Sequence, residues 1–123
     1  MAKDKLWAET PEKHDYPAAL DYLSLLMSDA AAAALVAKFK TARLTHRKAK
    51  DILRASGLPI LPRDNAHVAR DLKKIRNGKK LSPVLLVRGD RNAGVPLAIA
   101  DGYHRICASW HTDENALIPG RLV

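Results

Sequence analysis

The sequence predicts an α+β fold, with a small mixed β-sheet and packed helices preceded by a helical N-terminal extension. Three observations lead to this prediction. Residues 1–57 space their apolar side chains as amphipathic helices do. From residue 58 onward, short apolar runs bounded by Gly and Pro alternate with helical segments, which indicates strands packed against helices. A chain of 123 residues has room for one core, so we expect the extension over 1–57 and one domain over 58–123.

Three helices are expected in the N-terminal extension. The first covers residues 17–27, where a proline suits the helix start and leucines follow. The second covers residues 30–42, is rich in alanine, and can be capped by Ser28. Thr45 can cap the third helix, over residues 46–56, and the glycine that follows can end it.

The first half of the domain combines an extended segment, a helix and a strand. Two prolines make residues 58–62 extended and suited to the edge of a sheet. Asn65 can cap a helix over residues 66–77, which a glycine ends. The continuous apolar run 83–87 is typical of a buried strand.

In the second half of the domain, the sequence predicts a hairpin, a helix and a last strand. A loop over residues 89–94, rich in Gly, Asp and Asn, leads into a partner strand over 97–100. A helix over residues 103–110 follows directly, and the chain closes with a strand over 117–123.

Composition indicates where the protein works. No apolar run approaches the roughly 18 residues that a membrane span needs, and no apolar signal segment follows the N-terminus. The one cysteine, Cys107, excludes an internal disulfide and fits a reducing compartment. We therefore expect a cytoplasmic protein that does not enter the membrane, and its oligomeric state is left open.

Positive charge is concentrated in the middle of the chain. The net charge is +8, and residues 37–91 contain sixteen Lys and Arg against four Asp. Such a field favours anionic partners such as nucleotides or nucleic acid, although a solvated surface is the commoner explanation of charge runs. Four of these basic side chains could form the basic face of a helix-turn-helix, but we favour a solvated surface for them too. The four are Arg43, Arg47, Lys50 and Arg54.

The turn over residues 101–105 has the features of an anion site. A strand that stops at Asp101 and opens at once into a helix leaves unpaired N–H groups at the helix N-terminus. Gly102 lets the backbone approach a ligand, and the helix dipole favours an anion there. Arg105 lies in the first turn, where a cation opposes the dipole unless an anion is close. We therefore expect this turn to hold a phosphate.

A longer stretch around this turn resembles the ParB/sulfiredoxin-like superfamily. The resemblance rests on residues 99–108 and 118–123, and on a lead-in of a helix at 68–75 followed by the segment 81–87. It covers about residues 58–123. In that superfamily a Gly-x-x-Arg turn grips nucleotide phosphates, those of ATP in sulfiredoxins and those of CTP in ParB clamps. The resemblance implies a nucleoside triphosphate as ligand, with or without Mg²⁺.

The residues of the motif can be carried over one by one. Gly102, His104 and Arg105 fall on the phosphate-gripping positions. Tyr103 stands where sulfiredoxins have their catalytic cysteine, and Cys107 lies one helical turn further on, so sulfinic-acid reduction is not expected. ParB clamps usually have an acidic residue and a second arginine where this chain has Tyr103 and His104.

The helix predicted over residues 66–77 is expected to complete the pocket. His67, Arg70 and Lys74 share one face of it, away from its apolar residues. In sulfiredoxins the similar helix contributes to the nucleoside side of the site. Arg63, shortly before the helix, is a further candidate for binding.

Each candidate also has a structural interpretation. Packing is favoured over catalysis for Tyr103, and an inert buried thiol for Cys107. For His104 a role as phosphate ligand or acid–base is favoured over a plain surface position. Asp101 is interpreted as a turn or cap residue, with the orientation of Arg105 as the alternative. No cluster of Cys, His or carboxylates predicts a metal site.

Two functions of different classes follow. The first is a nucleotide- or phosphate-binding domain, and whether it is an enzyme is left open. Any catalysis would be phosphoryl transfer or hydrolysis, with Arg105 stabilising charge and His104 acting as acid or base. The alternative is a non-enzymatic nucleic-acid-binding or regulatory adaptor that uses the basic surface of residues 37–91.

Overall fold

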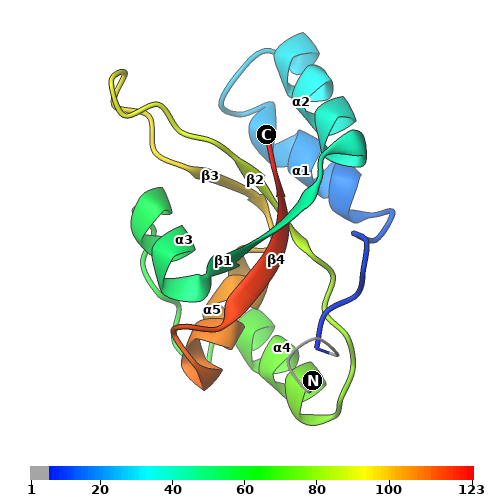
Figure 1. Cartoon of the computed structure of the whole chain (residues 1–123), viewed down its shortest axis with the longest axis vertical. Coiled ribbons are helices and arrows are strands. Elements are labelled where there is room, and N and C mark those ends of the chain that lie inside the picture. The colour runs from blue at the N-terminus through cyan, green and yellow to red at the C-terminus, as the bar shows by residue number, and fades with distance from the viewer. Residues whose placement is uncertain (1–5) are drawn as a thin grey trace.

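The computed structural model describes residues 6–123 and contains a four-stranded mixed sheet (Figure 1). β4 is an inner strand, which pairs antiparallel with β1 and parallel with β2, and β3 pairs antiparallel with β2. The order across the sheet is therefore β1-β4-β2-β3. The predicted α+β class is confirmed. The strands are β1 (Leu44–Lys48), β2 (Val84–Val87), β3 (Ala98–Asp101) and β4 (Leu117–Leu122).

Helices cover both faces of the sheet. Side chains of a strand alternate between the two faces, and those of β2 enter two different cores. Leu85 packs with residues of α1 and α2, whereas Val84 and Leu86 pack with residues of α3, α4 and α5. Figure 1 shows α1 and α2 towards one end of the molecule and α4 towards the other. The helices are α1 (Asp15–Leu23), α2 (Asp29–Thr41), α3 (Ala49–Ser56), α4 (Ala66–Arg76) and α5 (Tyr103–Thr112).

Two of the predicted side-chain caps, those of Ser28 and Asn65, are confirmed. The Ser28 hydroxyl accepts a hydrogen bond from the backbone N–H of Ala31 at 3.2 Å, at the start of α2. The Asn65 side chain accepts from the N–H groups of His67 and Val68, at 3.0 and 3.2 Å. These bonds satisfy N–H groups that have no partner within the helix, and the Asn65 cap fixes where α4 begins beside the site.

Residues 44–48 correct the prediction for the N-terminal segment. Thr45 does not cap a helix: it lies in β1, opposite Gly120 of β4, and its hydroxyl donates to the Gly120 carbonyl at 3.1 Å. α3 begins only at Ala49. The segment over 1–57 therefore contains an edge strand of the sheet as well as helices. Pairing with a strand about seventy residues away overrides the local preference, which is common for strands.

The same strand excludes the helix-turn-helix. Arg43 lies just before β1, Arg47 lies on β1, and Lys50 and Arg54 lie on α3. Because β1 separates α2 from α3, the four side chains do not line one face of two successive helices.

Two further segments differ from the prediction. α1 ends at Leu23, and the N–H groups of Leu25 and Leu26 bond three residues back in tight turns instead of continuing the helix. Residues 58–62 form neither a helix nor a strand, and they pair with no strand of the described chain. Their carbonyls hold α5 instead: Pro59 accepts from the Tyr103 hydroxyl, and Leu61 accepts from the His111 ring.

Within residues 6–123, no helix has both the length and the apolar character that a membrane span requires.

Candidate functional site

The candidate site begins where β3 passes into α5. Gly102 separates the two elements with a φ of 106°, a conformation that disfavours any residue with a Cβ atom. A Cβ at this position would also lie 2.4 Å from Cγ1 of Val84 on the neighbouring strand. Glycine is therefore required here for packing as well as for the turn, and it lets the N-terminus of α5 lie directly against β2.

Arg105 projects from the first turn of α5 and is largely buried. Its Nη2 donates to the Asp101 carboxylate at 3.2 Å and to the Pro83 carbonyl at 3.4 Å. Only 16% of its side chain is exposed, and its buried Nε has no hydrogen-bond partner among residues 6–123. Asp101 is thus not a cap: α5 has no side-chain cap, and the orientation of Arg105, the alternative role for Asp101, is the one observed.

A second carboxylate approaches Asp101 from α1. Asp15 is 1% exposed, accepts a hydrogen bond from the N–H of Glu12 at 2.8 Å, and lies close enough to Asp101 to hydrogen-bond with it when one of the two carboxyl groups is protonated. Burial raises the pKa of Asp101, the proximity of Asp15 raises it further, and Arg105 lowers it; the net result is a pKa of about 6. The charge of Asp101 therefore depends on pH close to the physiological range, and with it the charge balance around Arg105.

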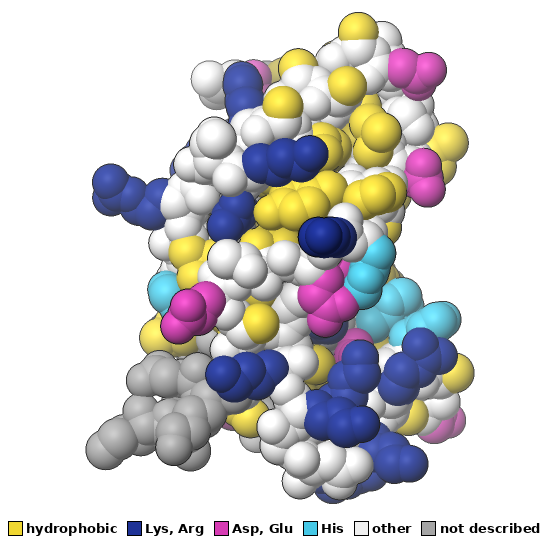
Figure 2. Space-filling view, turned by 90° about the vertical axis from the view of Figure 1, so that its right-hand side faces the viewer, with side chains coloured by type: hydrophobic (Ala, Val, Ile, Leu, Met, Phe, Trp, Pro, Cys, Tyr) yellow, Lys and Arg dark blue, Asp and Glu magenta, His cyan; other side chains and the backbone are white. Residues whose placement is uncertain are grey.

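A cavity of about 200 Å³ opens beside Arg105, between α4 and α5. It is polar, and most of its lining is basic or imidazole. The rings of His67 and His104, which both line it, are in tilted contact with their centroids 4.6 Å apart. Figure 2 shows Lys and Arg side chains gathered beside histidines at the α4 end of the molecule. The cavity is lined by His67, Arg70, Asp71, Lys74, Asp101, Gly102, His104 and Arg105.

The ionisation of the cavity favours a neutral imidazole at His104. Burial lowers the pKa of His104, the neighbouring His67 and Arg105 lower it further, and only Asp71 opposes them. Burial also raises the pKa of Asp71, which is 8% exposed. At neutral pH His104 can therefore donate one hydrogen bond and accept another, which suits a ligand oxygen or a proton transfer.

Six of the eight candidates for binding line this cavity, and two do not. Arg63 lies outside it and donates from Nη2 to the carbonyl of His111 at 2.8 Å. Tyr103 is also outside the lining, and its hydroxyl is tethered to Pro59, which fits the packing role favoured for it. The six that meet are His67, Arg70, Lys74, Gly102, His104 and Arg105.

Sequence reasoning missed Asp71 and Asp15. Asp71 lies one helical turn after His67, so the spacing that selected His67 could have selected it as well. Asp15 gives no such signal, because it reaches the site from α1 on the opposite side of the sheet.

Cys107 is not among the residues that line the cavity. Cys107 is fully buried, and burial raises the pKa of its thiol, so the thiolate that nucleophilic chemistry needs is disfavoured. Among residues 6–123, no group of three or more His, Cys, Asp or Glu side chains comes together as metal ligands do.

The chain was compared with protein-family models, with curated proteins and with solved structures. None of them matches it.

Proposed function

We propose that this protein binds a nucleoside triphosphate, with the phosphates in the cavity between α4 and α5. The observation that supports this is the meeting of three cationic side chains with one helix N-terminus in a single small cavity. Arg70 and Lys74 come from α4, and Arg105 from α5. Phosphate groups bind to guanidinium groups and to the free N–H groups of a helix start.

The resemblance to the ParB/sulfiredoxin-like superfamily supports the same ligand. The residues on its phosphate-gripping positions, Gly102, His104 and Arg105, all line the cavity. By that likeness the ligand is ATP or CTP. If a reaction follows, Arg105 stabilises charge on a phosphoryl oxygen, and the neutral imidazole of His104 moves a proton.

Two surface substitutions on α4 test the proposal without disturbing the core. The double variant Arg70→Gln with Lys74→Gln removes two cations that line the cavity. The matched control is Lys73→Gln with Arg76→Gln, which removes the same charge from the same helix at positions outside the lining. Calorimetric titrations with ATP, CTP and sulfate, with and without Mg²⁺, then compare both variants with the unmodified protein.

We expect ATP or CTP to bind the unmodified protein and the control about equally. The cavity variant should bind at least about tenfold more weakly, because each charge-assisted contact to phosphate contributes roughly 1.5–3 kcal/mol. Equal losses in both variants would mean that a diffuse positive field attracts the nucleotide. Absence of binding to every nucleotide would refute the proposal.

A nucleic-acid-binding function is the second candidate, favoured by the gathering of Lys and Arg at the α4 end (Figure 2). In that case Lys73 and Arg76 would contribute as much to the affinity as Arg70 and Lys74, because contacts to the phosphate backbone of a nucleic acid are spread over a protein surface. Affinity for a labelled DNA duplex should then fall steeply with salt, with a slope of about one per phosphate contacted. A flat salt dependence would exclude this function.

A further inference from the structure

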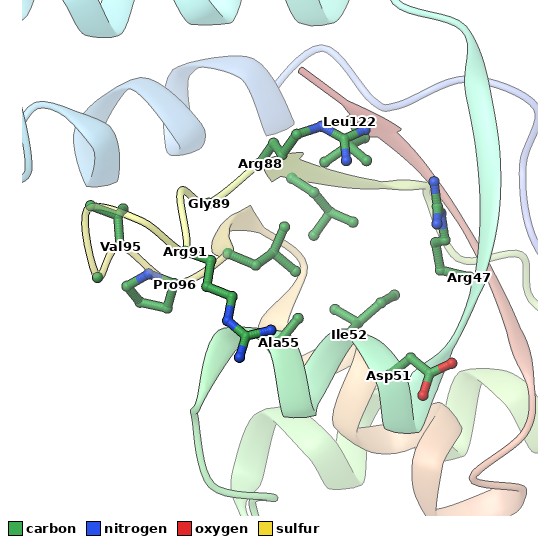
Figure 3. Close-up of a pocket in the computed structure, with 13 residues that line it drawn as sticks. Arg47, Asp51, Ile52, Ala55, Arg88, Gly89, Arg91, Val95, Pro96 and Leu122 are labelled. Atoms are coloured by element: carbon green, nitrogen blue, oxygen red, sulfur yellow. The ribbon is translucent and has the colours of Figure 1, made fainter.

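A second and larger cavity lies on the other side of α3. Its volume is about 780 Å³, within the range of about 300–1,000 Å³ that is typical of small-molecule sites. It shares no lining residue with the cavity between α4 and α5. α3 is only eight residues long and leaves part of the sheet uncovered. The cavity lies beside α3, between the sheet and the loop that joins β2 to β3 (Figure 3).

The inner wall of this cavity is apolar. Leu86 of β2 and Leu122 of β4 contribute from the sheet, and Ile52 contributes from α3. Leu97, which leads into β3, completes the wall, and Val95 at the loop is 53% exposed. These side chains offer no hydrogen-bonding group, so they favour an apolar chain or ring over a sugar or a nucleobase.

The rim of the cavity is cationic. Arg47 comes from β1, Arg88 from the end of β2, and Arg91 from the loop, and Figure 3 shows Arg47 across the cavity from Arg91. Within residues 6–123, the side chains of these three arginines make no ion pair and no hydrogen bond. The one carboxylate of the lining, Asp51, lies 3.5 Å from Arg54, which is outside the lining.

The walls are held in place before any ligand arrives. The N–H of Leu97 donates to the Ala55 carbonyl at 3.1 Å, which ties the loop to α3. Asp90 and Val95 bond each other in both directions at 2.8 Å and close the loop. Gly89 packs so tightly that a Cβ there would lie 2.5 Å from the Val95 carbonyl oxygen. A preformed cavity binds without the cost of ordering its walls.

We propose that this cavity binds a small amphipathic anion, an apolar chain or ring that ends in one carboxylate or phosphate. The apolar body lies against Ile52, Leu86 and Leu97. The anionic head lies at the rim, where three arginines without partners are available and guanidinium groups bind either head in two-point contact. This ligand differs in chemistry from a nucleotide, whose base and sugar carry hydrogen-bonding groups for which the apolar wall offers no partner.

The probes separate the two parts of the ligand. Decanoate and decyl phosphate have the apolar body with each kind of head, decanol has the body alone, and sulfate has the charge alone. Binding below the micelle concentration is followed by calorimetry and by backbone amide shifts of Ile52 and Leu97. We expect one or both of the anionic amphiphiles to bind at least about tenfold more tightly than decanol, as one desolvated charge-assisted contact implies.

Two variants and one control, all at exposed positions, localise the binding. The double variant Arg88→Gln with Arg91→Gln should bind the anionic amphiphiles about tenfold more weakly and should bind decanol with unchanged affinity, because only the anionic head loses contacts. Ala55→Trp should fill the cavity and abolish binding of both kinds, whereas Ala34→Trp on the exposed face of α2 should change nothing. The proposal is overturned if no amphiphile binds, if decanol binds as tightly as decanoate and decyl phosphate, or if Ala55→Trp binds like the unmodified protein.

Discussion

Replacing Asp101 by asparagine tests how the site balances its charges. The carboxylate is in contact with Arg105 at 3.2 Å, yet burial and Asp15 together raise its pKa to about 6 from the ordinary 3.8. The side chain is 17% exposed, so solvent screens these effects only weakly. The asparagine of the variant Asp101→Asn would resemble the protonated carboxyl, since its amide N–H can donate to Asp15, and it cannot ionise.

The expected effect follows from the direction of the pKa shift. A carboxyl whose pKa is raised in the folded state stabilises the fold below its unfolded pKa, and this contribution is lost as the pH rises through about 6. Between about pH 4.5 and about pH 7.5 the free energy of unfolding of the unmodified protein should therefore fall by about 2 kcal/mol through this carboxyl group. The variant Asp101→Asn should not show this fall. The stability difference between variant and unmodified protein should shift by this amount in favour of the variant.

Urea unfolding at the two pH values measures this change, with tryptophan fluorescence as the signal. Comparison of the difference at both pH values removes any effect of the substitution that does not depend on pH. Asp21→Asn is the control, because Asp21 lies exposed on α1 and loses the same charge. If Asp101→Asn instead becomes less favourable as the pH rises, the ion pair with Arg105 outweighs burial and the reasoning is wrong.

Three further predictions concern the turn, the second helix and the ligand. Gly102→Ala should destabilise the fold by about 2–4 kcal/mol in urea unfolding, because the new Cβ meets Val84 and the φ of 106° is strained. Ser28→Ala should lower the free energy of unfolding by about 1 kcal/mol in the same measurement, since α2 loses its cap. An unchanged midpoint of urea unfolding would show that the cap is dispensable. Sulfate, which stays a dianion over this range, should bind more tightly as the pH falls through about 6, where Asp101 becomes neutral. Calorimetry at fixed ionic strength checks this, and a pH-independent affinity would contradict it.

Local sequence signals were sufficient for much of the fold. Ser28 and Asn65 form hydrogen bonds within their own helices, so a short window contains everything that defines them. The apolar run of β2 and the Asp101-Gly102 turn are local in the same sense. For the cavity between α4 and α5, the spacing on one helix face and the residues after the turn were enough to name six lining residues.

Features that depend on distant partners were not predictable. β1 consists mainly of polar residues without the alternation of a half-buried strand, and it exists because β4 lies beside it. The contact between Asp15 and Asp101 depends on how α1 packs on β3. The cavity with the three arginines is likewise formed by β1, β2, β4, α3 and a loop, and none of these segments indicates it alone.

The position of β4 has a consequence for the kinetics of folding. This strand comes last along the chain, yet it lies between β1 and β2, so neither edge of the sheet can join the other before it is in place. Arg121 on β4 also donates from Nη1 to the carbonyls of Phe39 and Lys40, at 2.9 and 3.0 Å, at the end of α2. Closing such long loops slows folding, because chain entropy is lost before the contacts form. The helices and the β2–β3 pair can thus form early on a growing chain, whereas β1 joins the sheet, and the cavity lined by Arg47 and Leu122 is completed, only with residues 117–122.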